Sequence, residues 1–171
     1  MEVDNLDIAA SIESAEPGET EIWNMNLYNQ LTSLEGRINR LRYLLLTILF
    51  LVIALVYAII VGVVLAVLLI GMGLPEIIFN ITFGFIMIPV VYVAYAITVK
   101  RLQDTGRGGG WITLAQANAV LTILYLMVPI GSSVEGVLDI TTTIMALPLG
   151  IVCLFFGGDT GPNQFGPDPL G

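Results

Sequence analysis

Four long apolar stretches decide what this chain can fold into. They cover residues 43–71, 77–99, 111–130 and 137–156, and the only charged side chain within them is Asp139. A helix rises about 1.5 Å per residue and needs roughly 20 apolar residues to cross a bilayer core of ~30 Å. Each stretch reaches that length. The sequence therefore predicts an all-α integral membrane protein with four transmembrane helices arranged as two hairpins.

The composition favours the same class and narrows the chemistry. Of the 171 residues, 56% are hydrophobic and 12% are charged, and the mean hydropathy is +0.89. That balance leaves too little polar surface for a water-soluble domain. The chain has no His and one Cys, so it cannot build the common zinc, haem-histidine or cysteine–histidine sites alone. We expect no catalytic residue, metal site or cofactor, and no nucleic-acid partner.

The N-terminal part differs from the rest. Eight of the fourteen acids precede residue 36, in a segment without Lys or Arg, and the formal net charge of the chain is -8. Residues 1–20 are expected to form a disordered acidic tail that is retained, since they lack a signal peptide's basic region. In residues 21–36, apolar side chains recur every three or four positions, which predicts an amphipathic interfacial helix ended by a left-handed cap at Gly36. A helix packed on the protein itself is the alternative.

The basic residues predict the orientation of residues 37–171, the membrane domain. All six lie in two places on one side of the expected bundle: Arg37, Arg40 and Arg42 before the first span, and Lys100, Arg101 and Arg107 between the second and third. Positively charged loops stay on the cytoplasmic side. Both termini, including a Gly/Pro-rich C-terminal segment, are therefore expected to be cytoplasmic.

The glycine-rich stretch "VKRLQDTGRGGGW", residues 99–111, raises the question of a phosphate-binding loop. A P-loop needs a preceding strand and a Lys and Ser/Thr after the last glycine, and neither is present. The stretch "GGDTGPNQFGPDP", residues 157–169, lacks the carboxylate spacing of a calcium-binding loop. Both stretches are better explained as turns.

The stretch "GRINRLRY", residues 36–43, precedes the first span. Asn39 is a plausible helix N-cap, which would place Arg40 and Arg42 in the first turn, where the helix dipole disfavours cations. Lipid phosphates would compensate, or carboxylates of the chain itself: Asp104, Asp159 and Asp168. Lys100 and Arg101, by contrast, follow the C-terminus of the second span, where the dipole favours them and no special role is needed.

These three stretches, in this order, resemble the domain-of-unknown-function 805 family of small bacterial inner-membrane proteins, over about residues 23–169. The matching positions are Gly36, Arg37 and Arg40, then Arg101, Leu102, Asp104 and Arg107, and finally Gly161, Asn163, Phe165, Gly166, Asp168 and Pro169. The chain departs from the family in its acidic tail and in the Gly-Gly before Trp111, where a Ser and a second aromatic are common. The resemblance implies plasma-membrane residence and a four-span fold, but no agreed reaction.

A cytoplasmic hub is the candidate site, with a structural role or a role in binding lipid or a partner. Its expected members are Arg37, Arg40, Arg42, Arg101, Asp104, Arg107, Trp111, Asn163 and Asp168. Within it, Asp104 should lie within salt-bridge distance of Arg37 or Arg40. Residues 157–169 should fold back over the same place, and the glycines of residues 106–110 should supply a turn.

Small residues recur every four positions in two spans. They are Ala54, Ala58, Gly62 and Ala66 in the first, and Thr142, Ala146 and Gly150 in the fourth. This spacing lets helix backbones approach closely, so we expect helix contacts there, with chance in an Ala- and Gly-rich chain as the alternative. In the third span, Asn118, Thr122 and Tyr125 share one face, which should point into the bundle or a wet cavity.

Three function classes remain open at this point. The leading one is a non-catalytic accessory or scaffolding subunit whose hub engages anionic lipid or a membrane-protein partner. The second is a small channel or transporter that forms a homo-oligomer, with a path lined by polar side chains: Asn80, Tyr92, Tyr95, Gln116, Asn118 and Tyr125. The third is a membrane-surface enzyme with Asp104 and Asp168 as an acid/base pair.

Overall fold

The computed structural model describes residues 31–170, and within them the chain is helical with no strand. The helices are α4 (Arg40–Leu65), continued by the short π-helix η1 (Ala66–Ile70), α5 (Glu76–Asp104), α6 (Gly110–Met127) and α7 (Ser133–Phe155). Four of these units are long and apolar enough to cross a membrane. The predicted fold class, a multi-pass helical membrane protein, is confirmed.

The helix ends follow from local chemistry. Asn39 caps α4 as expected, because its side chain accepts a hydrogen bond from the Arg42 backbone N–H at 2.8 Å. Ser132 caps α7 in the same way, accepting from the Glu135 N–H at 3.1 Å. The third helix is shorter than the predicted stretch of residues 111–130. It stops at Met127 because Val128 precedes a proline and adopts an extended conformation.

The expected interfacial helix of residues 21–36 lies mostly outside the described residues, as does the whole of the expected tail, residues 1–20. Residues 31–36, the part of this predicted helix that the structure describes, differ from the prediction. Helix stops at Thr32, and residues 33–35 are not helical. The Ser33 hydroxyl accepts a hydrogen bond from the Glu35 N–H at 3.0 Å, a local bond that competes with helical hydrogen bonding. Gly36 does adopt a positive φ of 97°, but in a bend rather than as a helix cap.

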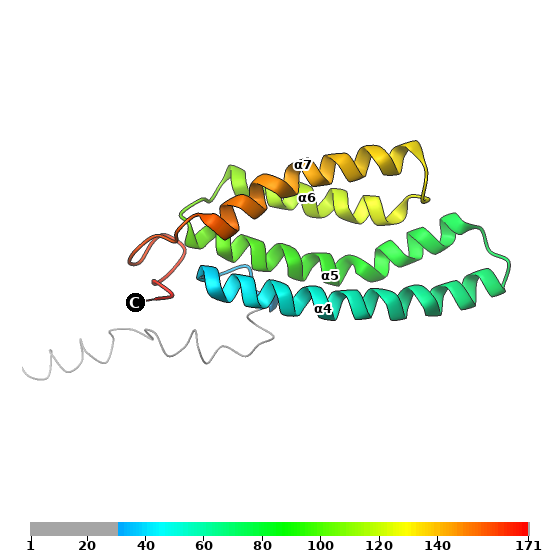
Figure 1. Ribbon diagram of the computed structural model, residues 1–171, viewed down its shortest axis with the longest axis horizontal. Helices are drawn as coiled ribbons and strands as arrows, with labels where there is room; N and C mark the ends of the chain where they lie inside the picture. The colour runs from blue at the N-terminus through cyan, green and yellow to red at the C-terminus, as the bar shows by residue number, and fades with distance from the viewer. Residues whose placement is uncertain (1–30, 171) are drawn as a thin grey trace, which may run out of the picture.

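The helices form two hairpins, α4 with α5 and α6 with α7, and α5 also packs against α6 (Figure 1). The buried core lies toward one end of the bundle. Its members are Ile38, Tyr43, Ile97, Leu102, Ala115, Leu149, Val152 and Cys153. The loop between α5 and α6 and the C-terminal loop, residues 157–170, lie at this same end, which we call the hub end. Elsewhere the outer helix faces expose large apolar side chains, as lipid-facing helices do.

The small-residue stripe of α4 is turned toward α5. Its three members on α4 and the fourth, Ala66 at the start of η1, are all half-buried, whereas most of their neighbours on α4 are exposed. A Cβ atom built on Gly62 would lie 3.8 Å from the Phe83 ring of α5. The stripe of α7 is placed differently, because Ala146 is exposed and no heavy atom lies within 4 Å of a Cβ on Gly150. The expected helix contact at Gly150 is thus missing from the described part of the chain, since α7 buries Leu149 and its neighbours instead.

Gly62→Leu is expected to lower the stability of the α4–α5 hairpin, by about 1 to 3 kcal/mol, because a branched side chain would have to enter the contact with Phe83. Val63→Leu is the control, since Val63 is 57% exposed and points away from that contact. Thermal unfolding of the detergent-purified variants measures both. Equal tolerance of the two changes would mean that the spacing in α4 is coincidental.

The orientation of the bundle is a separate prediction. With both termini cytoplasmic, a membrane-impermeant maleimide added to intact cells should label a Cys placed at Ser133 and should not label one placed at Ser11. The native Cys153 is buried and should give no background. Labelling at position 11 but not at position 133 would reverse the orientation.

Candidate functional site

Three charged side chains form a buried ion cluster at the hub end: Arg37, Arg101 and Asp104. Their exposed fractions are 2%, 0% and 2%. Asp104 is the last residue of α5, and its Oδ1 lies 3.2 Å from Nη2 of Arg37. Its Oδ2 contacts Nη1 of Arg101, one helical turn earlier. The predicted approach of Asp104 to Arg37 is confirmed, and each carboxylate oxygen faces one guanidinium.

Arg37 also binds the C-terminal loop. Its Nη1 donates to the carbonyl oxygens of Gly161 at 2.7 Å and Gly166 at 3.3 Å. Its Nη2 donates to the carbonyl oxygen of Asp159 at 2.6 Å. A guanidinium carries five N–H donors in a fixed fork, so a single arginine can hold several carbonyls at once. Arg37 therefore ties the entry of α4 to three points of the loop.

Arg101 binds the other elements of the hub end. Its Nε donates to the Cys153 carbonyl at 2.8 Å, and its Nη2 donates to the Phe156 carbonyl at 2.5 Å. Cys153 lies in the last turn of α7 and Phe156 is its C-cap residue, so these carbonyls lack helical partners and the helix dipole favours a cation there. Nη1 also reaches the carbonyl of Ile38 at 3.4 Å. The expectation that Arg101 needs no special role is wrong, because it joins α5, α7 and the entry of α4.

The C-terminal loop folds back over the ion cluster, as predicted. The Asp159 N–H donates to the Asp104 carbonyl at 2.7 Å, and the Asn163 amide donates to the Gln103 carbonyl at 3.0 Å. The Gly158 backbone lies so close to the Asp104 side chain that a Cβ atom would overlap its carboxylate. The backbone of the C-terminal loop therefore covers the C-terminal end of α5.

The loop is braced internally by Asp168. Its Oδ1 accepts from the Leu170 N–H at 2.9 Å and its Oδ2 accepts from the Gly161 N–H at 2.7 Å. These backbone donors, together with the nearby Arg37 charge, lower the pKa of the Asp168 carboxyl. Asn163 adds two main-chain bonds with Gly166, at 3.0 and 3.1 Å. Asp168 therefore shapes the loop through its hydrogen bonds to two backbone N–H groups.

The turn between α5 and α6 uses glycine as expected. Gly106 and Gly109 have φ values of 66° and 55°. Residues that carry a Cβ atom rarely adopt such positive φ angles. A Cβ on Gly108 would lie 2.7 Å from Cζ of Phe165, so the loop ring packs directly on this backbone. Sequence reasoning placed the glycines in a turn, but it did not foresee that Gly108 and Gly158 are contact surfaces.

With this geometry in hand, comparison with known proteins gives one result. Residues 31–167, most of the chain, match the family described as protein of unknown function DUF805. The chain is a DUF805 protein. No protein of curated function and no solved structure matches it.

The other expected hub residues of this DUF805 chain lie around the ion cluster. Arg40 is exposed and forms no ion pair with any residue from 31 to 170, so the expected carboxylate partner for Arg40 is not found there. Arg42 is half-buried. The Arg107 guanidinium lies 4.2 Å from the centre of the Phe156 ring, a cation–π contact. Trp111 packs on the buried core at the start of α6.

The charged groups of the ion cluster in the DUF805 chain are engaged with one another and with main-chain carbonyls. Both carboxylate oxygens of Asp104 face guanidiniums, and Arg37 and Arg101 each have several carbonyl partners. A depression of about 380 Å³ opens at the cluster, and its lining includes Arg101 and Asp104 together with Arg40, Asp159 and Asp168. The cluster therefore ties the entry of α4, the end of α7 and the C-terminal loop to the end of α5, and Arg40 and Asp159 are exposed charges around the depression.

Proposed function

We propose that this DUF805 chain is a non-catalytic accessory or scaffolding subunit of the bacterial plasma membrane, with its hub end in the cytoplasm. The observation that carries the proposal is the buried ion cluster, in which Arg37 holds the C-terminal loop and Arg101 holds the end of α7. An enzyme needs at least one reactive group that a substrate can reach. A scaffold instead needs a surface of fixed shape, and residues 157–170 supply one.

The C-terminal loop is the surface we assign to a protein partner. Thr160 and Gln164 are exposed on it, and Asp159 adds an exposed carboxylate. The loop backbone is tied to α5 and to Arg37, so little conformational entropy would be lost when a partner binds. Its acidic side chains favour a partner with a basic surface.

Anionic lipid is the second partner we propose, bound by the first turn of α4. Arg40 is exposed there and Arg42 is half-buried, both beside the backbone N–H groups of the helix N-terminus. A lipid phosphate would compensate the exposed Arg40 charge and the helix dipole together, contributing about 1 kcal/mol per basic residue near the membrane surface. Arg40→Gln should then weaken binding to vesicles that contain anionic lipid without unfolding the protein.

The channel alternative has less support. Asn118 and Tyr95 line one cavity, but Gln116 and Tyr92 are exposed on outer faces. Tyr92 donates its hydroxyl to the Thr32 carbonyl at 2.8 Å, outside the bundle. The side chains expected to line a path therefore do not share one passage.

Site-specific photo-crosslinking in intact cells tests the scaffold proposal. A photoreactive residue at Gln164 or Thr160 should give one discrete protein adduct, and the same residue at Ser133, at the opposite end of α7, should not. Purified protein in liposomes should carry no ion or solute flux. Absence of any adduct from both loop positions, or a flux that depends on the protein, would overturn the proposal.

A further inference from the structure

The hub end carries more positive than negative charge within residues 31–170. All six Lys and Arg side chains of the chain lie there, in residues 37–42 and 100–107. Four carboxylates of the described residues lie at the same end: Glu35, Asp104, Asp159 and Asp168. The remaining three lie at the opposite end of the bundle: Glu76, Glu135 and Asp139. Six cations against four carboxylates leave an excess of two positive charges, which attracts an anionic group to this end.

Two of these cations, Arg42 of α4 and Lys100 of α5, lie near each other, and we call them the basic pair. Lys100 is 3% exposed and Arg42 is half-buried, and they are close enough for their positive charges to repel. Arg40 lies elsewhere, since two residues along a helix are about 200° apart and Arg40 lines the depression beside the C-terminal loop. Two like charges that are partly removed from water are stabilised by an anion near both.

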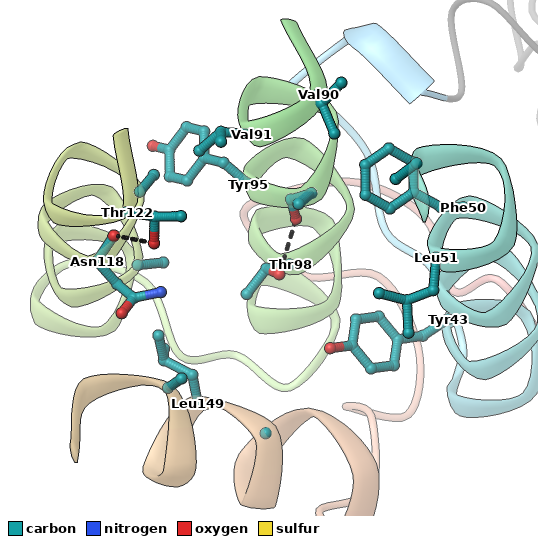
Figure 2. Close-up of a pocket in the computed structure, with 16 residues that line it drawn as sticks. Tyr43, Phe50, Leu51, Val90, Val91, Tyr95, Thr98, Asn118, Thr122 and Leu149 are labelled. Atoms are coloured by element: carbon teal, nitrogen blue, oxygen red, sulfur yellow. Dashed lines mark hydrogen bonds between the residues drawn. The ribbon is translucent and has the colours of Figure 1, made fainter. Parts of the chain in front are cut away.

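The basic pair lies on the side of α5 that the beginning of the described chain approaches. Figure 2 shows Thr98 on the side of α5 that faces α7. Lys100 follows two residues later, about 200° around the helix, so it projects away from α7. Tyr92 lies only about 80° around the helix from Lys100, and its hydroxyl donates to the Thr32 carbonyl at 2.8 Å. The chain that precedes Thr32 therefore reaches α5 on the same side as Lys100.

Residues 1–30 have the opposite charge. They contain seven Asp and Glu residues and no Lys or Arg, and the four nearest to Leu31 are Glu13, Glu16, Glu19 and Glu21. Leu31 packs on the buried core of the hub end, and Lys100 lies about 12 Å along α5 from Tyr92. A chain can extend by roughly 3.3–3.6 Å per residue, so each of these four carboxylates can reach the basic pair. The covalent link also gives them a high effective concentration there.

We infer that an acidic segment of the same chain, residues 13–21, binds to the basic pair through its carboxylates. This contact offsets the excess positive charge of the hub end. A segment without a cation gains from every approach to Arg42 and Lys100, since none of its own charges is repelled. Arg40 and the C-terminal loop lie elsewhere on the hub end and stay accessible to the partners proposed above.

Zero-length cross-linking tests this inference, because Lys100 is the sole lysine in the sequence. A carbodiimide activates a carboxylate, the Lys100 amine attacks the acyl carbon, and an amide bond forms as a urea leaves. The full chain is treated in nanodiscs of zwitterionic lipid, at one chain per disc, and the amide is located by mass spectrometry. It should join Lys100 to a carboxylate of residues 13–21. No amide at Lys100, or an amide only to carboxylates of residues 31–170, would overturn the inference.

Two further comparisons separate specific binding from a loose acidic chain that only passes nearby. Arg42→Gln should lower the amide yield roughly two- to fivefold, as expected for one partly exposed ion pair, whereas the matched change Arg40→Gln should leave it near the wild-type value. Gln164→Lys adds an exposed lysine at the same end of the bundle. Lys100 should still capture the larger share of residues 13–21, although it is far less exposed. Equal effects of the two arginine changes, or greater capture at position 164, would contradict the binding of this segment to the basic pair.

Discussion

Asp104→Asn is expected to lower the free energy of unfolding by roughly 3 to 5 kcal/mol, the usual cost of breaking a buried ion pair. The change removes the only carboxylate that Arg37 and Arg101 share within the described residues, and leaves two buried guanidiniums uncompensated. It also weakens the attachment of the C-terminal loop to the bundle, because Arg37 binds the loop and Arg101 binds the end of α7. Thermal unfolding in a mild detergent should show the loss as a large fall in Tm.

Glu76→Gln is the matched control for that experiment. It also removes one carboxylate charge from α5, but Glu76 is exposed at the opposite end of the helix. Exposed ionic interactions contribute only about 0 to 1 kcal/mol, so its Tm should stay near that of the wild type. Similar Tm values for the two variants would show that the ion cluster does not stabilise the bundle.

Gly158→Ala is expected to have the second-largest effect. A Cβ at Gly158 would overlap the Asp104 carboxylate, and that carboxylate cannot move away without breaking its contacts with Arg37 and Arg101. Overpacking of this kind costs about 1 to 3 kcal/mol, and here it should also displace the loop. Limited proteolysis of residues 157–170 and thermal unfolding measure the two consequences.

The neighbouring glycine supplies the control. A Cβ on Gly157 meets no atom within 4 Å, and its φ is not positive, so Gly157→Ala should behave as the wild type. The pair separates a specific contact from a general need for flexible chain after α7. If both substitutions release the loop equally, flexibility is the explanation and the close approach at Gly158 is unimportant.

The four helices could be predicted from the sequence because lipid imposes a simple rule of length and polarity. The contact between Asp104 and Arg37 could also be predicted, because the alternation of apolar and polar stretches brings these two residues to one end of the bundle. The i,i+3 spacing of Arg101 and Asp104 places them on one helix face, and it could have indicated their contact. We did not predict this contact, because the helix dipole alone is enough to explain a cation such as Arg101 near the C-terminus of α5.

Other features depend on main-chain positions that no sequence pattern specifies. Arg101 binds carbonyl groups of Cys153 and Phe156, and a carbonyl is present in every residue, so the sequence contains no signal for these partners. The close contact at Gly158 depends on how the loop lies across α5. The open face at Gly150 has a similar origin, because a four-residue period does not decide which side of α7 meets the bundle.

Hydrogen exchange of the C-terminal loop tests the central claim most directly, namely that the ion cluster holds residues 157–170 in one shape by internal contacts. The Asp159 and Gly161 amides donate to Asp104 and Asp168 at 2.7 Å each. In nanodiscs of zwitterionic lipid alone, both amides should exchange slowly, and added anionic lipid should leave their rates unchanged. Exchange at the rate of unstructured chain, or protection that arises only with anionic lipid, would contradict the account.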